Sequence, residues 1–241
     1  MVEITPLWLL PRDLWVALGL TLQLAAVSTL LLMLVVLPLG WWLATSRNRL
    51  ALLLEILMSI PLVLPPTVIG FYLLVLLSPR HAPGSWWQAW FGQTLPFSFS
   101  GLVIGSCVYS LPFALQPVLA GFRMLRPETA QAAYSLGMTR LQAFVHIFLP
   151  LSRAGVYSGA ILAFAHTLGE FGVVLMLGGG IPGVTRVASI ALYDDVQRLN
   201  YADAHGFALL LLGVSFLLLC ATTLLQRRQA HWRQTSQFIH H

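Results

Sequence analysis

Residues 14–44 read LWVALGLTLQLAAVSTLLLMLVVLPLGWWLA, without one charged side chain. A helix crosses a ~30 Å hydrocarbon layer with roughly 20 apolar residues, so this run is long enough for one tilted membrane span. The composition of the whole chain fits a lipid environment. Of its 241 residues, 58% are hydrophobic and 9% are charged, whereas soluble domains average about 25% charged residues.

Further apolar runs predict further spans, and a single transmembrane domain is expected over residues 1–241. The fold class is therefore an all-α membrane protein, a polytopic bundle of about five transmembrane helices. The expected spans are approximately 14–44, 50–77, 99–122, 155–177 and 204–225. Residues 81–98 are rich in Trp, Gly and Pro and predict an interfacial loop or short helix at headgroup depth.

The arginines predict the orientation, because all thirteen basic residues are arginine and cytoplasmic loops are enriched in basic residues. With five spans, nine arginines fall on one side and four on the other. The side with nine is expected to face the cytoplasm, with the N-terminus outside and the C-terminus inside. The expected location is the inner (cytoplasmic) membrane of the cell. This distribution explains the net charge of +5 without a nucleic-acid partner. The nine are Arg47, Arg49, Arg123, Arg126, Arg140, Arg153, Arg227, Arg228 and Arg233, and the four are Arg12, Arg80, Arg186 and Arg198.

Proline and glycine predict where the helices bend and meet. Pro61, Pro65 and Pro66 interrupt the second run, where they remove backbone donors and kink the helix. Such breaks are tolerated where freed carbonyls face a cavity or other helices. Gly101-x-x-x-Gly105 and Gly155-x-x-x-Gly159 provide flat surfaces for close helix contact.

The loop over residues 123–153 is too long for a simple turn and predicts two short helices. Pro127 suits the first position of a helix, and Glu128 follows in the first turn, where the helix dipole favours an acid. Gly137 is suited to a left-handed C-terminal position. The first helix is thus expected to begin at Pro127 and to end before Gly137.

The second helix is expected to begin at Thr139, because Thr139-Arg-Leu-Gln142 fits a capping box. It should reach Leu149 and stop at Pro150. Two short helices under the membrane would form a compact docking surface for a soluble partner.

The same loop carries the pattern Gln131-Ala132-Ala133-x-x-x-Gly137-x9-Ile147-x-Leu149-Pro150. It resembles the EAA loop of type I ABC-importer permeases, in which the loop forms a coupling helix seated in a groove of the ATPase subunit. Gln131 stands in place of the usual Glu, while the helix shape and contact surface are expected to persist. The resemblance implies an ATPase-coupling role for Glu128, Gln131, Ala132, Ala133, Gly137, Ile147, Leu149 and Pro150.

Three further segments narrow the family: SIPLVLPPTVIG at 59–70, LAFAHTLGEFG at 162–172 and GIPGVTR at 180–186. They resemble the molybdate permeases, whose close relatives are the sulfate and tungstate permeases. The resemblance implies ATP-driven import of a small oxyanion, with molybdate expected and sulfate or tungstate as alternatives. It also implies a second copy of the chain, two cytoplasmic ATPase subunits that bind ATP and Mg, and an extracytoplasmic oxyanion-binding protein. A stand-alone channel or secondary transporter would leave the EAA-like loop unexplained.

Glu170 is the one acid well inside a predicted span, which makes it a functional candidate. Two unit charges ~4 Å apart at an effective dielectric of 20 cost about 4 kcal/mol when alike, and a dianion doubles that. A gate or packing role is therefore expected, with Glu170 paired to an Arg or backbone donors, or protonated. A His166–Glu170 pair and a packed neutral His166 both remain open. The pathway or gate candidates are Pro65, Pro66, His166, Gly169, Glu170, Phe171 and Gly172, and Ser106, Tyr109 and Ser110 are candidate polar lining.

The sequence predicts no enzyme. No nucleophile–base pair, metal-ligand cluster or phosphate-binding loop is visible, and a chain without Lys cannot contain GxxxxGK[ST]. Neither a catalytic residue nor a cofactor is expected in this chain, and ATP must be hydrolysed by another polypeptide.

Overall fold

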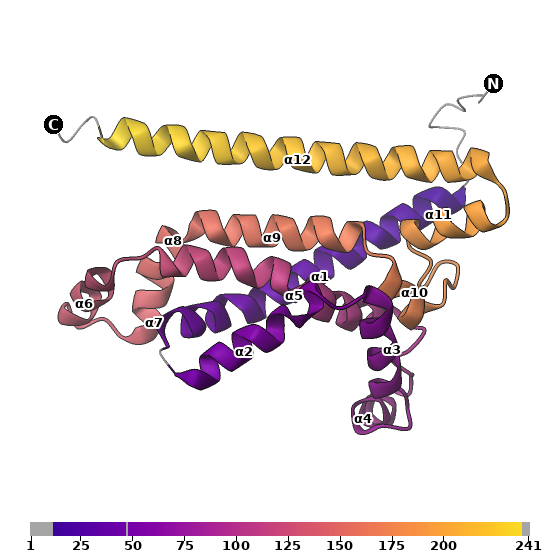
Figure 1. Ribbon diagram of the computed structural model, residues 1–241, viewed down its shortest axis with the longest axis horizontal. Coiled ribbons are helices and arrows are strands. Elements are labelled where there is room, and N and C mark those ends of the chain that lie inside the picture. The colour runs from indigo at the N-terminus through magenta and orange to yellow at the C-terminus, as the bar shows by residue number, and fades with distance from the viewer. Residues whose placement is uncertain (1–11, 47, 238–241) are drawn as a thin grey trace.

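The computed structural model describes residues 12–46 and 48–237, except for the side chains of residues 12, 127 and 221–237. Within these ranges the regular structure is entirely helical (Figure 1), which confirms the predicted all-α class. Among the arginines used for the orientation, Arg47 and the side chains of Arg12, Arg227, Arg228 and Arg233 lie outside the described part. The helices are α1 (Arg12–Thr45), α2 (Arg49–Ser59), η2 (Ile60–Leu62), α3 (Pro66–Leu76), α4 (Ala82–Phe91), α5 (Phe99–Arg123), α6 (Pro127–Ser135), α7 (Arg140–Ala143), η3 (Phe144–Phe148), α8 (Leu149–Leu151), α9 (Arg153–Leu168), α10 (Gly172–Gly178), α11 (Ala188–Gln197) and α12 (Tyr201–Gln237).

Three helical segments among the described residues are long and apolar enough to cross a membrane alone: Asp13–Thr45, Phe99–Arg123 and Tyr201–Cys220. Two bent helix pairs raise the number to five if each pair is one span. One pair joins α2 and η2 to α3, and the other joins the segment 140–151 to α9. The bundle thus contains three to five candidate spans, as expected for a polytopic permease.

The second predicted run is bent by 112° between α2–η2 and α3. Pro65 is the N-cap of α3 and Pro66 occupies its first turn, where a residue without an N–H is tolerated. The predicted proline kink is therefore confirmed. Beyond α3, the short helix α4 covers part of the Trp-rich stretch, and Trp90 is 83% exposed.

A second interruption lies inside the predicted run 155–177, which the structure divides between α9 and α10. Helix α9 ends at Leu168 and α10 begins at Gly172. The intervening residues place Glu170 on a non-helical step between two helices.

The core of the bundle is formed where α1, α5 and α9 pack together. Leu115 and Val118 of α5 have no exposed surface, and they share one apolar cluster with Val36 of α1 and Ala163 of α9. A second cluster joins α5 to α3 and α10 through buried side chains such as Val173. Helix α5 therefore contacts all the elements that carry the candidate gate residues.

The predicted glycine surfaces serve contacts within the chain. A Cβ at Gly155 would lie 2.5 Å from the Pro117 carbonyl oxygen, and one at Gly159 would lie 2.6 Å from that of Ala114. Both glycines thus let α9 approach the backbone of α5. Gly105 makes the corresponding contact with α10, at the side chain of Leu177.

Helix α12 runs along the outside of the bundle beside α9 and α11 (Figure 1). Near its start Ala204 and Phe207 are buried, and Phe207 packs in a cluster with residues of α1 and α11. Further along, Leu212, Phe216 and Leu217 are each more than 60% exposed. Such a surface is suited to lipid contact.

Candidate functional site

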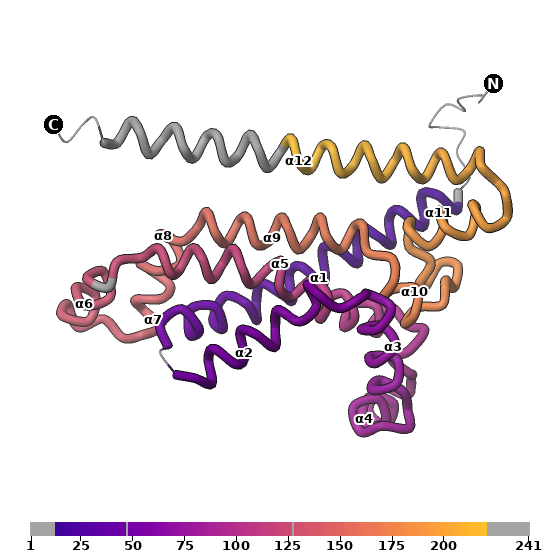
Figure 2. The backbone as a smooth tube through the Cα atoms, in the orientation of Figure 1, coloured from indigo at the N-terminus to yellow at the C-terminus, as the bar shows by residue number. Residues whose placement is uncertain are grey.

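The segment Pro127–Leu151, called the knob here, projects at one end of the bundle with α6 at its tip (Figure 2). Both predicted helix starts are confirmed. Pro127 lies in the first turn of α6, and Thr139 caps α7 with the expected capping box. The Thr139 N–H donates to Gln142 Oε1 over 2.8 Å, and the Gln142 N–H donates to Thr139 Oγ1 over 3.3 Å. Between the helices, Gly137 has φ +77°, the left-handed region that glycine adopts without cost.

The second helix of the knob differs from the prediction that it stops at Pro150. Helix α7 continues through a π-helical turn, Phe144–Phe148, and through α8 to Leu151, and only then bends by 76° into α9. A π-helical turn and a proline both rearrange the ladder of backbone hydrogen bonds. The chain accordingly bends after the proline and not at it.

One face of the knob is fixed to the bundle by aromatic contacts. The Trp41 ring lies 5.1 Å from Phe144 and 5.9 Å from Phe148, measured between centroids. Phe122 at the end of α5 lies 6.1 Å from Phe144. Ala133 of α6 is only 1% exposed and packs against the same cluster. The knob is therefore packed against the ends of α1 and α5.

Other side chains of the knob are uncovered. Leu136 is 82% exposed and Leu141 is 71% exposed, and the same segment exposes polar residues such as Gln131 and Arg140. The predicted coupling residues divide between exposed and buried positions. Glu128, Gln131, Ala132, Gly137 and Pro150 are exposed, Ile147 and Leu149 are half-buried, and Ala133 is buried against the bundle.

The place where α3 and α10 begin brings together four of the gate candidates: Pro65, Pro66, Phe171 and Gly172. A Cβ at Gly172 would lie 2.9 Å from the Pro66 ring, so these two residues are in direct contact, and Pro65 precedes them as the N-cap of α3. Phe171 packs on Tyr193 of α11, with 4.9 Å between ring centroids. Gly169, by contrast, is exposed at the end of α9. The structure thus joins α3, α10 and α11 around the break.

Glu170 is buried in this region, with 3% of its surface exposed. Neither carboxyl oxygen makes a hydrogen bond of standard geometry within the described residues, although the Ser106 hydroxyl is close enough to act on the carboxyl. The backbone is held instead, because Ser189 Oγ donates to the Glu170 carbonyl oxygen over 2.7 Å. The predicted partners, an arginine or backbone donors, are not found among the described residues. An unpaired charge in such a place costs several kcal/mol, so the site suits a neutral side chain.

His166 packs against α5 and does not pair with Glu170. Its Nδ1 lies 2.9 Å from Ser110 Oγ, and its ring stacks on Phe113 with 3.8 Å between centroids. Ser110 also contacts the Thr167 hydroxyl at 2.9 Å. Of the two alternatives for His166, the packed histidine is the one found. The Ser110 hydroxyl connects α5 to α9. Because Ser106 and Ser110 have no exposed surface, neither hydroxyl lines an open pathway.

An ion pair between α2 and α5 was missed by the sequence analysis. Arg123 donates from two nitrogens to the two oxygens of Glu55, at 3.0 and 2.6 Å. One turn further along α2, Gln116 Nε2 donates to Ser59 Oγ over 2.9 Å. Glu55 stands out as the only acid of its run, but its partner lies 68 residues away, and no local pattern predicts that pairing.

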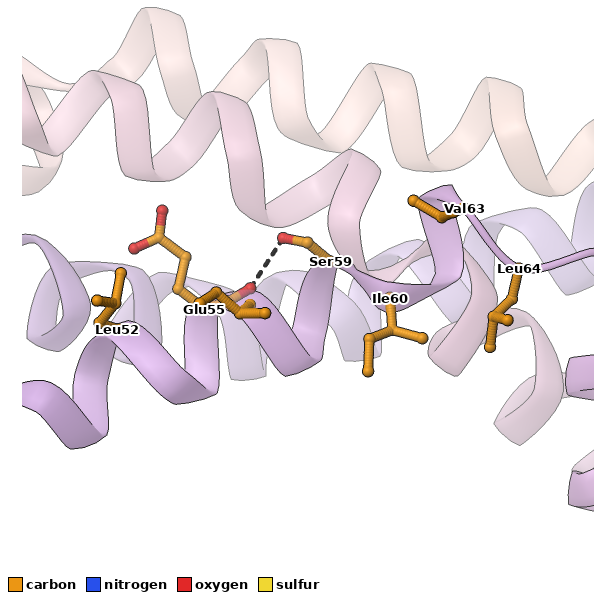
Figure 3. Close-up of a pocket in the computed structure, with 7 residues that line it drawn as sticks. Leu52, Glu55, Ser59, Ile60, Val63 and Leu64 are labelled. Atoms are coloured by element: carbon orange, nitrogen blue, oxygen red, sulfur yellow. Dashed lines mark hydrogen bonds between the residues drawn. The ribbon is translucent and has the colours of Figure 1, made fainter.

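The α2 side of this contact opens onto a groove of about 490 Å³. Figure 3 shows that Glu55 and Ser59 project on the side of α2 that faces a neighbouring helix, beside apolar side chains of α2 and η2. The groove is lined by Leu52, Glu55, Ile56, Ser59, Ile60, Val63 and Leu64.

Comparison with known proteins assigns a family to this architecture. Residues 36–231 match the family described as "Binding-protein-dependent transport system inner membrane component". The molybdenum transport system permease protein ModB of Azotobacter vinelandii is 45% identical over 85% of this chain and 91% of its own length. The sulfate transport system permease protein CysT of Escherichia coli is 33% identical over 78% of this chain and 68% of its own. The crystal structure of a bacterial ABC transporter involved in alginate import matches the fold with a TM-score of 0.73 at 18% identity, over 90% of this chain and 80% of that one.

Proposed function

This chain belongs to the family of binding-protein-dependent transport system inner membrane components, and from that premise we propose that it conducts molybdate through the membrane in an ATP-driven importer. The family places it in the inner membrane as a multi-pass permease without ATPase activity of its own. The observation that carries the choice of anion is the 45% identity to a molybdenum permease over 85% of the chain, against 33% to a sulfate permease.

The proposed coupling to ATP runs through the knob. Its exposed residues, Leu136 among them, are suited to a groove on a soluble ATPase, while its aromatic side chains pack against α1 and α5. ATP binding would close two ATPase subunits and draw two knobs together, which opens the pathway outward. Hydrolysis would return it to the inward-facing state.

A second copy of the chain completes the proposed pathway. The bent α2–α3 segment leaves large apolar side chains uncovered, with Val63 86% exposed and Tyr72 66% exposed. Two copies facing each other through this surface would enclose a conduit, for which one bundle of this size offers little room. Two ATPase subunits and an extracytoplasmic binding protein complete the proposed importer, and that protein selects the anion.

Uptake by the reconstituted importer tests this proposal. Liposomes that hold the permease and its ATPase, with the binding protein added outside, are expected to accumulate radioactive molybdate only when ATP is inside. Excess unlabelled sulfate should compete less well than unlabelled molybdate. Full uptake without the ATPase would overturn the ABC assignment, and stronger competition by sulfate would instead support the sulfate-permease alternative.

Cross-linking tests the docking face of the knob. In a background with Cys107 and Cys220 replaced by alanine, Leu136→Cys is expected to form a disulfide with a cysteine placed in the ATPase groove. Ala133→Cys, three residues earlier on the same segment, should not, because Ala133 is buried against the bundle. Equal cross-linking at both positions, or at a Gln88→Cys control in α4, would contradict the assignment.

A further inference from the structure

Helix α5 presents polar side chains toward the α2–η2 groove at its C-terminal end. Gln116 and Arg123 are exposed, and their separation of two helical turns places them on one helix face. Both reach α2, at Ser59 and Glu55 respectively. This face therefore carries two side chains with N–H donors beside Glu55 and Ser59, which line the groove.

The donors are only partly used. A guanidinium has five N–H donors, and Glu55 takes one from each of two nitrogens of Arg123. The Gln116 amide has two donors, of which Ser59 takes one. Arg123 has half of its side chain exposed, whereas Glu55 is only 17% exposed. Unused donors thus remain accessible, and the carboxylate occupies the fork of Arg123 as an oxyanion would.

We propose that Arg123 and Gln116 form a transient binding site for a dianionic oxyanion at the cytoplasmic end of the pathway, and that Glu55 occupies this site when the anion is absent. This inference rests on the proposed function and on the predicted orientation, which places the C-terminal end of α5 in the cytoplasm. Ser59 acts as a positioning residue that holds the Gln116 amide.

The chemistry of the Arg123–Glu55 pair is suited to weak, reversible binding of an anion and not to tight binding. A bidentate guanidinium fork matches the geometry of carboxylate and oxyanion alike, so a dianion can replace the singly charged carboxylate of Glu55. An ion pair that is partly open to water contributes little net stability, so little is lost in the exchange. When Glu55 returns to Arg123, it competes with the anion and promotes its release.

The alternative role for this pair is a structural tie between α2 and α5. The two roles predict different directions of change in anion affinity for two single substitutions. Glu55→Gln and Arg123→Gln both break the tie, so a purely structural role changes anion binding in the same direction in both variants. In the anion site, Glu55→Gln removes a competitor and Arg123→Gln removes the donor, so binding changes in opposite directions.

The direction of each change in anion affinity is measured by equilibrium binding. The sample is the complete permease–ATPase complex in nanodiscs, without nucleotide and without the binding protein. Radioactive molybdate is expected to bind about fivefold tighter to Glu55→Gln, because the carboxylate that competes for Arg123 is lost. It should bind about tenfold more weakly to Arg123→Gln, because charge-assisted hydrogen bonds are lost. Arg49→Gln, an exposed arginine at the start of α2, is the matched control and should bind as the wild type does.

Parallel titrations with tungstate and sulfate separate this inference from the proposed function. If wild-type liposomes transport sulfate and not molybdate, the proposed substrate is wrong, but the opposite signs are still expected with sulfate as the probe. Three results would overturn the anion site. The affinity could change in the same direction in Glu55→Gln and Arg123→Gln, or it could stay unchanged in both. The third is an effect of Arg49→Gln as large as that of Arg123→Gln. Thermal stability of each variant, followed by size-exclusion chromatography after heating, verifies that the complexes are folded.

Discussion

Gly155→Leu is expected to abolish accumulation of the folded permease. Gly155 lies where α9 approaches the backbone of α5, and an added Cβ would be 2.5 Å from the Pro117 carbonyl oxygen and 3.0 Å from Gly121 Cα. Overpacking a core costs about 1–3 kcal/mol and occasionally more. Here backbone atoms block the side chain, so we expect a loss of at least ~3 kcal/mol, a large share of a typical stability of about 5–15 kcal/mol.

The measurement is the amount of monodisperse permease–ATPase complex after mild heating in detergent. Gly19→Leu is the matched control, because Gly19 is an exposed helical glycine of α1 with no atom within 4 Å of an added Cβ. The control should remain near the wild-type level. A Gly155→Leu complex as heat-resistant as the control would show that the close contact of α5 and α9 is not required.

Glu170→Lys is the second substitution expected to have a large effect. The Glu170 side chain is buried, with no hydrogen-bond partner of standard geometry in the described part of the chain. A lysine there would place a cation among Ser106 and apolar neighbours, and an uncompensated buried charge costs about 3–5 kcal/mol. The variant should therefore lose most of its folded complex, measured as for Gly155.

Glu170→Gln distinguishes the loss of charge from the loss of shape. A neutral amide of similar size fits a site that suits a neutral side chain, so its stability should lie within about 1 kcal/mol of the wild type. Uptake should also persist if the role of Glu170 is packing at the break between α9 and α10. Loss of uptake with intact folding would instead indicate that the ionised carboxylate takes part in transport.

Local sequence was sufficient wherever a few neighbouring residues determine the outcome. The apolar runs predicted an all-helical membrane bundle, because lipid requires every backbone hydrogen bond to be made within the helix. Pro65 and Pro66 predicted a sharp bend, since a residue without an N–H interrupts that ladder. Thr139 and Gln142 predicted a helix start, because a capping box lies within four residues.

Contacts between distant segments were beyond such reasoning. The burial of Ala133, the packing of His166 on Phe113, and the ion pair between Glu55 and Arg123 each depend on which helices become neighbours. The break at Glu170 is a further case, because the stretch 155–177 is apolar enough to predict one continuous span. At this break, Gly172 at the start of α10 lies against Pro66 of α3, a contact between distant segments.

The sequence by itself determined the all-helical membrane bundle, the proline bend and the helix start at Thr139, because hydropathy, proline and capping signals act over one or two helical turns. Its resemblance to a known family predicted a permease, and the coupling role of the knob stays a prediction. Tertiary structure alone decided which residues of the knob are exposed, which helix packs against Gly155, and which carboxylate pairs with Arg123. The physical reason is that close packing and ion pairing depend on distances in space, and residues 68 positions apart in the chain carry no local signal of one another.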